Sequence, residues 1–293
     1  MSHSRILLCG GTHGNELSGI ALVNNCIDDA EYAQSCFPQS QVEIDFLQAN
    51  AAAVTRNTRF CEADLNRQFD STSLAMQNGL NQEHALALEL NRIYGPKDAP
   101  QYDLVIDIHN STANMGSNLI LLAADEYNRG LARFVHSRLP DVKVTVEDHV
   151  PFASHPYLCT IGKRGVMVEI GPQPQGILRA KAYQQSLYLS QLIVQYEALV
   201  QQNKQSLMAP IEAYQWSHEV SFPQDEQGNK TAMIHPDLQD NDFKPLKAGD
   251  PIFIDKYNKV TYWQGDVVYP HFIGEAAYYR AGIAFAVAKK IRF

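Results

Sequence analysis

Cysteines are few in this sequence of 293 residues, and they occur in none of the patterns in which cysteines usually act together. Their number is odd, they are scattered, and no two of them form a CxxC pair. A disulfide framework or a cysteine-rich metal knuckle is therefore not expected, and a reducing compartment fits better. The five positions are Cys9, Cys26, Cys36, Cys61 and Cys159.

Long apolar runs and an excess of positive charge are also missing. The opening MSHSRILLCGG has four apolar residues in a row, and no later segment approaches the roughly eighteen that a membrane span requires. The formal net charge of −8 leaves no basic surface for nucleic acid or an anionic membrane. The sequence therefore predicts a cytoplasmic protein that binds neither of them.

The composition is that of a globular protein, with 45% hydrophobic and 19% charged residues. The length is sufficient for a substantial core, in one large domain or two moderate ones. An acidic protein that handles a small anion must concentrate positive charge locally, so individual arginines carry most of the information.

Apolar runs bounded by turn residues predict strands over 5–10, 42–49, 103–109, 118–122, 142–146 and 166–170. Helical spacing of apolar residues predicts helices over 16–27, 74–94 and 178–202. Strands that alternate with helices imply an α/β fold with a largely parallel sheet covered on both faces.

The character of the chain changes after the polar stretch 201–205. Short extended segments at 213–222, 251–254, 260–263 and 284–291 alternate with Pro, Gly, Asn and Asp turns. We therefore expect a larger domain over 1–204 and a small β domain over 205–293, with the boundary near Lys204.

The segment GGTHGNE follows the first predicted strand and carries His13 and Glu16, three residues apart. Ligands bind at the carboxyl ends of strands in open α/β sheets, and an imidazole with a carboxylate is a common pair of zinc donors. A glycine-rich turn after a first strand more often binds the phosphate groups of a nucleotide. The nucleotide-binding pattern GxGxxG is not matched here, however, and no Gly-Lys-Ser/Thr follows.

His109 ends another apolar run and is the candidate third ligand, with Asp107 on the same side of the strand to orient it. A single histidine at a strand end is usually only a satisfied polar residue. Three suitable donors at two strand ends make a metal site the stronger interpretation.

Glu169 lies in the apolar strand VMVEIG, where an unpaired carboxylate would be costly to bury. It is a candidate general base for metal-assisted hydrolysis or a salt-bridged structural residue.

The polar segment RFCEADLNR carries three further candidates, which are Arg59, Asn66 and Arg67. Arginine suits bidentate capture of a carboxylate or stabilisation of an oxyanion, whereas the alternative is a solvated charged loop.

Several longer blocks occur together and in a fixed order, and they cover nearly the whole chain. They are GGTHGNELSG, DLNRQFD, DIHNSTANMG, VEIGPQPQGILRA, IHPDLQDNDFKPL and GEAAYY. In this combination the sequence resembles the aspartoacylase family, whose larger domain is similar to zinc carboxypeptidases. The resemblance implies a zinc-carboxypeptidase-like mixed sheet with flanking helices, plus a smaller C-terminal β domain that narrows the entrance of the site.

The resemblance also implies roles for individual residues. His13, Glu16 and His109 correspond to the ligands of one zinc ion, and Glu169 to the glutamate that activates water. The remaining matches are Arg59, which polarises the scissile carbonyl, Asn66 and Arg67, which grip the substrate carboxylate, and Tyr278, which reaches in from the C-terminal domain. A homodimer is implied as well.

Two positions depart from the members that act on N-acetylaspartate. Cys159 stands where they have an arginine for the side-chain carboxylate, and Gly282 where they have a lysine. The expected function is therefore zinc-dependent hydrolysis of N-acyl-L-aspartate, with N-acylated aromatic or other neutral amino acids as the alternative substrates. A metal-free binding protein on the same scaffold is a further alternative.

Overall fold

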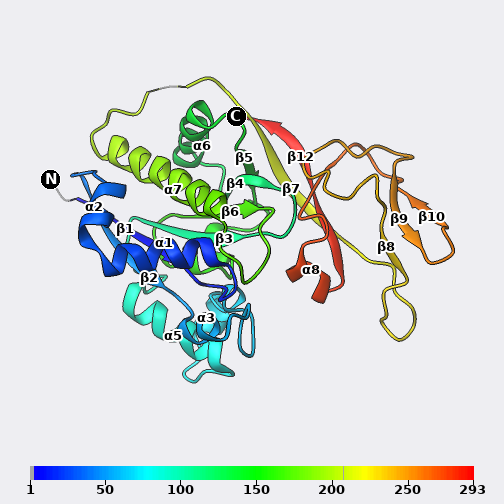
Figure 1. Cartoon of the computed structure of the whole chain (residues 1–293). Helices are drawn as coiled ribbons and strands as arrows, with labels where there is room; N and C mark the ends of the chain where they lie inside the picture. The colour runs from blue at the N-terminus through cyan, green and yellow to red at the C-terminus, as the bar shows by residue number, and fades with distance from the viewer. Residues whose placement is uncertain (1–2, 207) are drawn as a thin grey trace.

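The computed structural model describes residues 3–206 and 208–293. Its main feature is a nine-stranded sheet in the order β11-β12-β7-β5-β4-β6-β3-β1-β2 (Figure 1). The strands are β1 (Ser4–Gly10), β2 (Val42–Gln48), β3 (Leu104–Asn110), β4 (Gly116–Leu121), β5 (Lys143–Val146), β6 (Gly165–Gly171), β7 (Glu212–Ser221), β11 (Tyr269–His271) and β12 (Ile283–Arg292).

The sheet is mixed. The strands β2, β1, β3 and β6 are parallel neighbours, whereas β4 runs antiparallel to β6 and reverses the direction of that half of the sheet. The pairs β7–β12 and β12–β11 are antiparallel too. The expectation of a largely parallel sheet therefore holds for its first half, and the mixed sheet implied by the resemblance is confirmed.

Helices and turns cover the two faces of the sheet differently. The side-chain alternation of β3 sends Ile106 and Ile108 into a core formed with α1, α6 and α7, while Asp107 and His109 point to the other face. That other face is covered by α5, two 3-10 turns and the loop between β2 and α4. The polar residues of β3 thus lie under irregular chain, where a site can form. The helices are α1 (Leu17–Asp28), α2 (Ala30–Cys36), α3 (Ala51–Arg56), η1 (Leu65–Arg67), α4 (Ser71–Leu74), α5 (Gln82–Tyr94), α6 (Glu126–Arg138), η2 (Phe152–Ser154), η3 (Leu158–Ile161) and α7 (Ala180–Gln201).

The strands expected over 5–170 are all present, with ends that agree within two residues. One helix prediction was wrong in part. We expected one helix over 74–94, but the structure has two helices with a break between them: α4 ends at Leu74, and α5 begins at Gln82. The second helix begins there because the Asn81 side chain accepts the backbone N–H of His84 and caps it. The α6 helix was not predicted, since its apolar residues, Leu131, Phe134 and Val135, lie among charged ones.

The C-terminal part adds strands to the main sheet and forms a second, smaller sheet. The latter has the order β10-β9-β8, with β8 (Ala232–Ile234), β9 (Pro251–Asp255) and β10 (Val260–Tyr262), and it lies at one end of the molecule (Figure 1). A short helix, α8 (Ala276–Arg280), lies between β11 and β12 in the chain and contacts β12. The division near Lys204 stays a prediction, because β7 and β12 also continue the large sheet.

No helix within the described residues is both long enough and apolar enough to cross a membrane.

Candidate active site

His13 and Glu16 lie in the tight turn between β1 and α1, and Glu16 is the residue before the helix begins. The turn is packed so closely that it needs glycine at two positions. A side chain at Gly10 would collide with the backbone of Gly19, and one at Gly14 with the backbone of Ala53. The glycines therefore serve close packing of the turn. His13 Nδ1 lies 2.8 Å from Glu16 Oε1, so the two side chains converge as their spacing predicts.

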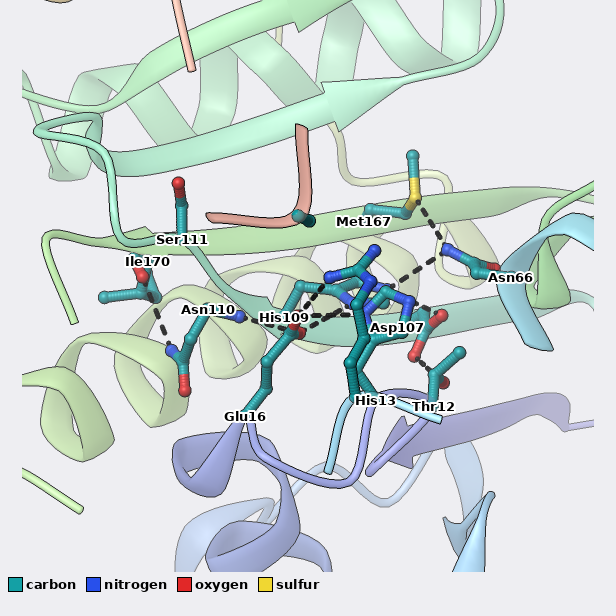
Figure 2. Close-up of polar contacts among 12 residues, drawn as sticks. Thr12, His13, Glu16, Asn66, Asp107, His109, Asn110, Ser111, Met167 and Ile170 are labelled. Carbon is teal, nitrogen blue, oxygen red and sulfur yellow. Dashed lines mark hydrogen bonds and ion pairs between the residues drawn. The ribbon is translucent and has the colours of Figure 1, made fainter. Parts of the chain in front are cut away.

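His109, at the end of β3, completes the cluster (Figure 2). Its Nδ1 atom is 3.1 Å from His13 Nδ1 and 3.0 Å from Glu16 Oε2. One donor atom from each of these three residues lies within 4.8 Å of the others, and all three residues are buried. Sequence-distant donors thus converge on one point.

The donor set fits a zinc ion. Ligand atoms that share one tetrahedral zinc are separated by roughly 3.3 Å, close to the separations above. The far nitrogen of each imidazole also faces a carboxylate, with Asp107 Oδ2 2.8 Å from His109 Nε2 and Asp64 Oδ1 3.0 Å from His13 Nε2. Carboxylates in this position orient imidazole ligands and raise their basicity. Thr12 in turn donates to Asp107 at 2.7 Å.

The charges of the cluster are strongly coupled. Burial acts to raise the pKa of Glu16, but the adjacent His13 and His109 bring it well below its usual range. Burial likewise opposes protonation of His109, yet Asp107 and Glu16 raise its pKa well above the ordinary value. The site is therefore built to hold positive charge between carboxylates, which is also what a bound cation requires.

Glu169 lies beside His109 in the sheet, since the two residues are register partners on β6 and β3. Only 8% of the residue is exposed. Burial raises the pKa of its carboxyl group well above the usual value; His109 opposes this shift, while Glu16 and Glu275 add to it. A carboxylate so placed next to a cation site can exchange protons with a substrate.

The arginine-containing segment is held against the cluster and is not a solvated loop. Glu83 of α5 accepts the backbone N–H groups of Cys61, Glu62 and Ala63 at 2.6 to 3.0 Å and so fixes the loop. Arg59 then reaches Glu16 Oε1 at 3.0 Å and Asp64 Oδ2 at 3.0 Å.

Asn66 and Arg67 follow in the 3-10 turn η1. Asn66 is buried; its side-chain oxygen accepts the N–H of Leu158 at 2.8 Å, and its Nδ2 lies 3.5 Å from His109 Nε2. Arg67 is exposed and lies over the ring of Tyr157, 5.2 Å from the centroid. A rigid amide and an accessible guanidinium therefore stand side by side.

The C-terminal helix α8 supplies the last predicted residue. Glu275 precedes the helix and accepts hydrogen bonds from Ser111 and from Thr112 N at 2.7 Å, which ties α8 to the loop after β3. Tyr278 consequently lines the same cavity as the other seven predicted residues, namely His13, Glu16, Arg59, Asn66, Arg67, His109 and Glu169.

Sequence reasoning missed other residues of the cavity. Glu147, Tyr157 and Glu275 line it, together with apolar side chains such as Met167 and Phe272. Glu275 belongs to the GEAAYY block and could have been noticed there, whereas Glu147 stands outside every block and directly follows a strand.

The fold and this His-Glu-His cluster define a hydrolase-like α/β protein, and comparison with known proteins gives its family. Residues 2–196 match the model of the succinylglutamate desuccinylase/aspartoacylase catalytic domain, and residues 209–290 that of the AstE/AspA barrel-sandwich hybrid domain. The chain belongs to the succinylglutamate desuccinylase/aspartoacylase family.

Full-length relatives carry two different names. The chain is 34% identical to an aspartoacylase from Xenopus tropicalis, over 98% of this chain and 92% of that protein. It is 36% identical to a human N-acyl-aromatic-L-amino acid amidohydrolase (carboxylate-forming), over 99% and 91%. The crystal structure of murine aminoacylase 3 superposes with a TM-score of 0.91 and 32% identity, covering 100% of this chain and 97% of that one.

Proposed function

We propose that the protein is a zinc-dependent hydrolase that cleaves the amide bond of N-acyl-L-amino acids to a carboxylate and a free amino acid. The observation that carries this proposal is the convergence of His13, Glu16 and His109, with Glu169 beside them in one cavity. The names of the full-length relatives support the same reaction class.

His13, Glu16 and His109 would hold the ion, and Asp64 and Asp107 would orient the two imidazoles. Zinc in this place would lower the pKa of a water molecule towards neutrality and polarise the amide carbonyl. The metal-free binding protein is the weaker candidate, because the complete donor set and its supporting carboxylates are present together.

The other residues then have separate tasks. Glu169 takes the proton from the attacking water and returns it to the departing amine nitrogen. Arg59 stabilises the negative charge that develops on the carbonyl oxygen. Asn66 and Arg67 bind the α-carboxylate of the substrate, and Tyr278 closes the cavity from the C-terminal side.

The side chain of the amino acid separates two candidates. N-acyl-L-aspartate is the candidate that the sequence blocks favour, and N-acylated aromatic or other neutral amino acids are the second. Both names occur among the relatives at similar identity. A homodimer and a cytoplasmic location stay predictions.

The test is zinc analysis of the purified protein together with release of free amino acids from a panel of N-acetyl amino acids. We expect about one zinc per chain, and loss of turnover on chelation that is restored by added zinc. Protein with no affinity for zinc and no turnover of any substrate in the panel would contradict the proposal.

A further inference from the structure

Glu147 is a second carboxylate of the cavity lining and directly follows β5, whereas Glu169 lies on β6. The backbone N–H of Glu147 donates to Leu121 O at 2.8 Å, which continues the pairing with β4. Alternation along β5 places Glu147 on the same face as Thr145, and therefore on the face of Ile120, which also lines the cavity. In the strand order β5-β4-β6 it lies two strands away from Glu169.

This carboxylate is buried but only sparsely bound. The residue is 8% exposed, and Tyr157 donates its hydroxyl to Glu147 Oε2 at 3.0 Å. Burial raises the pKa of Glu147, while the Tyr157 hydrogen bond and the charge of Arg67 act to lower it. One carboxylate oxygen thus remains available to whatever occupies this part of the cavity.

Apart from the zinc ion of the proposed function, the cavity offers little free positive charge. Its lining includes two guanidinium groups, Arg59 and Arg67, against four carboxylates, which are Glu16, Glu147, Glu169 and Glu275. Arg59 is already paired with Glu16 and Asp64. Arg67 is exposed and is therefore the one guanidinium of the lining that can take a substrate carboxylate.

Basic residues nearby in the sequence do not supply the positive charge that a second substrate carboxylate would need. Lys163 pairs with Asp103 at 2.7 Å, and Arg164 with Glu197 at 3.3 Å. Arg280 lines a neighbouring cleft instead of this cavity. His155 stacks on Tyr157 with ring centroids 5.4 Å apart, and burial lowers its pKa to about 4, so it is neutral near pH 7.

The two departures from the aspartate pattern also have structural counterparts. Cys159 is fully buried in the core under the site and does not line the cavity. Gly282 has a φ of 79°, a backbone conformation that a lysine would adopt only with strain. Neither position can bring a charge to a second substrate carboxylate.

We propose that Glu147 is a specificity-determining residue that excludes a second carboxylate from the amino-acid side-chain end of the cavity. Accepted substrates then carry one negative charge, on the α-carboxylate, and a side chain that is uncharged or donates a hydrogen bond to Glu147. This inference rests on the proposed amide hydrolysis and names the substrate class of that site. Two carboxylates brought together in a partly desolvated cavity repel each other, and Arg67, the cation whose charge acts on Glu147, is already engaged by the α-carboxylate of the substrate.

N-acetyl-L-asparagine and N-acetyl-L-aspartate form a matched pair for the test, because they have nearly the same shape and differ in charge. We expect the zinc-loaded wild-type enzyme to prefer the asparagine derivative in kcat/KM. Glu147→Gln should shift the ratio of the two values towards aspartate by about tenfold or more. If turnover of both is slow, the same ratio is read from their inhibition constants against the N-acetyl amino acid that is cleaved fastest.

Glu226→Gln, in an exposed loop of the C-terminal part, is the control for the change in net charge and should leave the ratio unchanged. Glu147→Ala removes the charge without adding an amide and should shift the ratio in the same direction. A wild-type preference for aspartate, or a ratio that neither Glu147 variant moves, would overturn the inference. An equal loss on both substrates would also overturn it, since that result means that Glu147 only positions Arg67. Each of these results leaves hydrolysis standing, whereas absence of turnover on every N-acetyl amino acid contradicts the proposed function itself.

Discussion

The Nδ1 atoms of His13 and His109 lie 3.1 Å apart, although the two residues are separated by 96 positions in the chain. Glu16 contacts both imidazoles, at 2.8 and 3.0 Å. Such a convergence of buried donors is stable only if a cation or protons neutralise the carboxylate between them. The first experiments therefore concern the metal.

Removal of one ligand should remove zinc and activity together. His109→Ala leaves two protein ligands where a tight catalytic site requires three, so we expect less than stoichiometric zinc and no measurable turnover. His218→Ala, at an exposed position of β7, is the matched control and should keep both. Asp107→Asn should weaken zinc affinity by roughly 10–100-fold, because it alters only the partner of His109. Full zinc in the His109 variant would refute the ligand assignment.

The general base can be separated from the ligands by its effect on zinc. Glu169→Gln preserves the shape of the side chain but cannot accept a proton, so zinc should remain bound while kcat falls by about 10²-fold or more. Metal analysis and steady-state kinetics on the same preparation check this. Near-normal turnover in a folded, zinc-loaded variant would place the base elsewhere.

The α-carboxylate of the substrate should depend on Arg67. Arg67→Gln removes the accessible guanidinium, and we expect kcat/KM to fall on the order of 10²-fold, because the bound carboxylate loses its charged partner. The amides of the same N-acetyl amino acids lack that carboxylate and serve as the control. They should be poor substrates for the wild type, and the mutation should hardly change their rate. An equal loss on acids and amides would contradict the assignment.

Asp242 should make stability fall with rising pH. Burial raises the pKa of its carboxyl group from 3.8 to about 7, and the N–H of Ile273 donates to it at 3.1 Å. Between pH 4 and 7 the folded protein therefore holds a proton that the unfolded chain has released, so this group stabilises the fold at acidic pH and the contribution is lost as pH rises through 7.

Asp242→Asn isolates that effect, because the amide keeps an acceptor for Ile273 and does not titrate. The unfolding free energy of the wild type relative to the variant should fall between pH 4.5 and 8 by a few kcal/mol, on the order of 4 at most. Denaturant titrations at the two pH values measure this. Taking the difference removes the opposite pH dependence of His271, whose pKa burial lowers to about 4. A difference independent of pH would mean that Asp242 is charged in the folded protein.

Long-range predictions succeeded where they rested on strand ends. Patterns of apolar residues located β1, β3 and β6, and with them His13, His109 and Glu169, because such patterns arise from burial on both sheet faces. The role of Tyr278 came from resemblance alone, and for Arg59 the residue chemistry had left a solvated charged loop open as the alternative. Their places depend on contacts with residues far away, since Glu83 holds the loop of Arg59 and Glu275 ties α8 to the loop after β3.

What the sequence by itself determined was local. The spacing of His13 and Glu16 in a glycine-rich turn and the alternation of Asp107 and His109 along a strand both depend on chain geometry over a few residues. The tertiary structure decided the rest. It inserts β4 antiparallel, which brings Glu147 across the sheet to the cavity, and it holds Arg59 against Glu16 and Asp64. Strand order and charge neutralisation are properties of the packed chain, because they depend on which distant groups become neighbours once water is excluded.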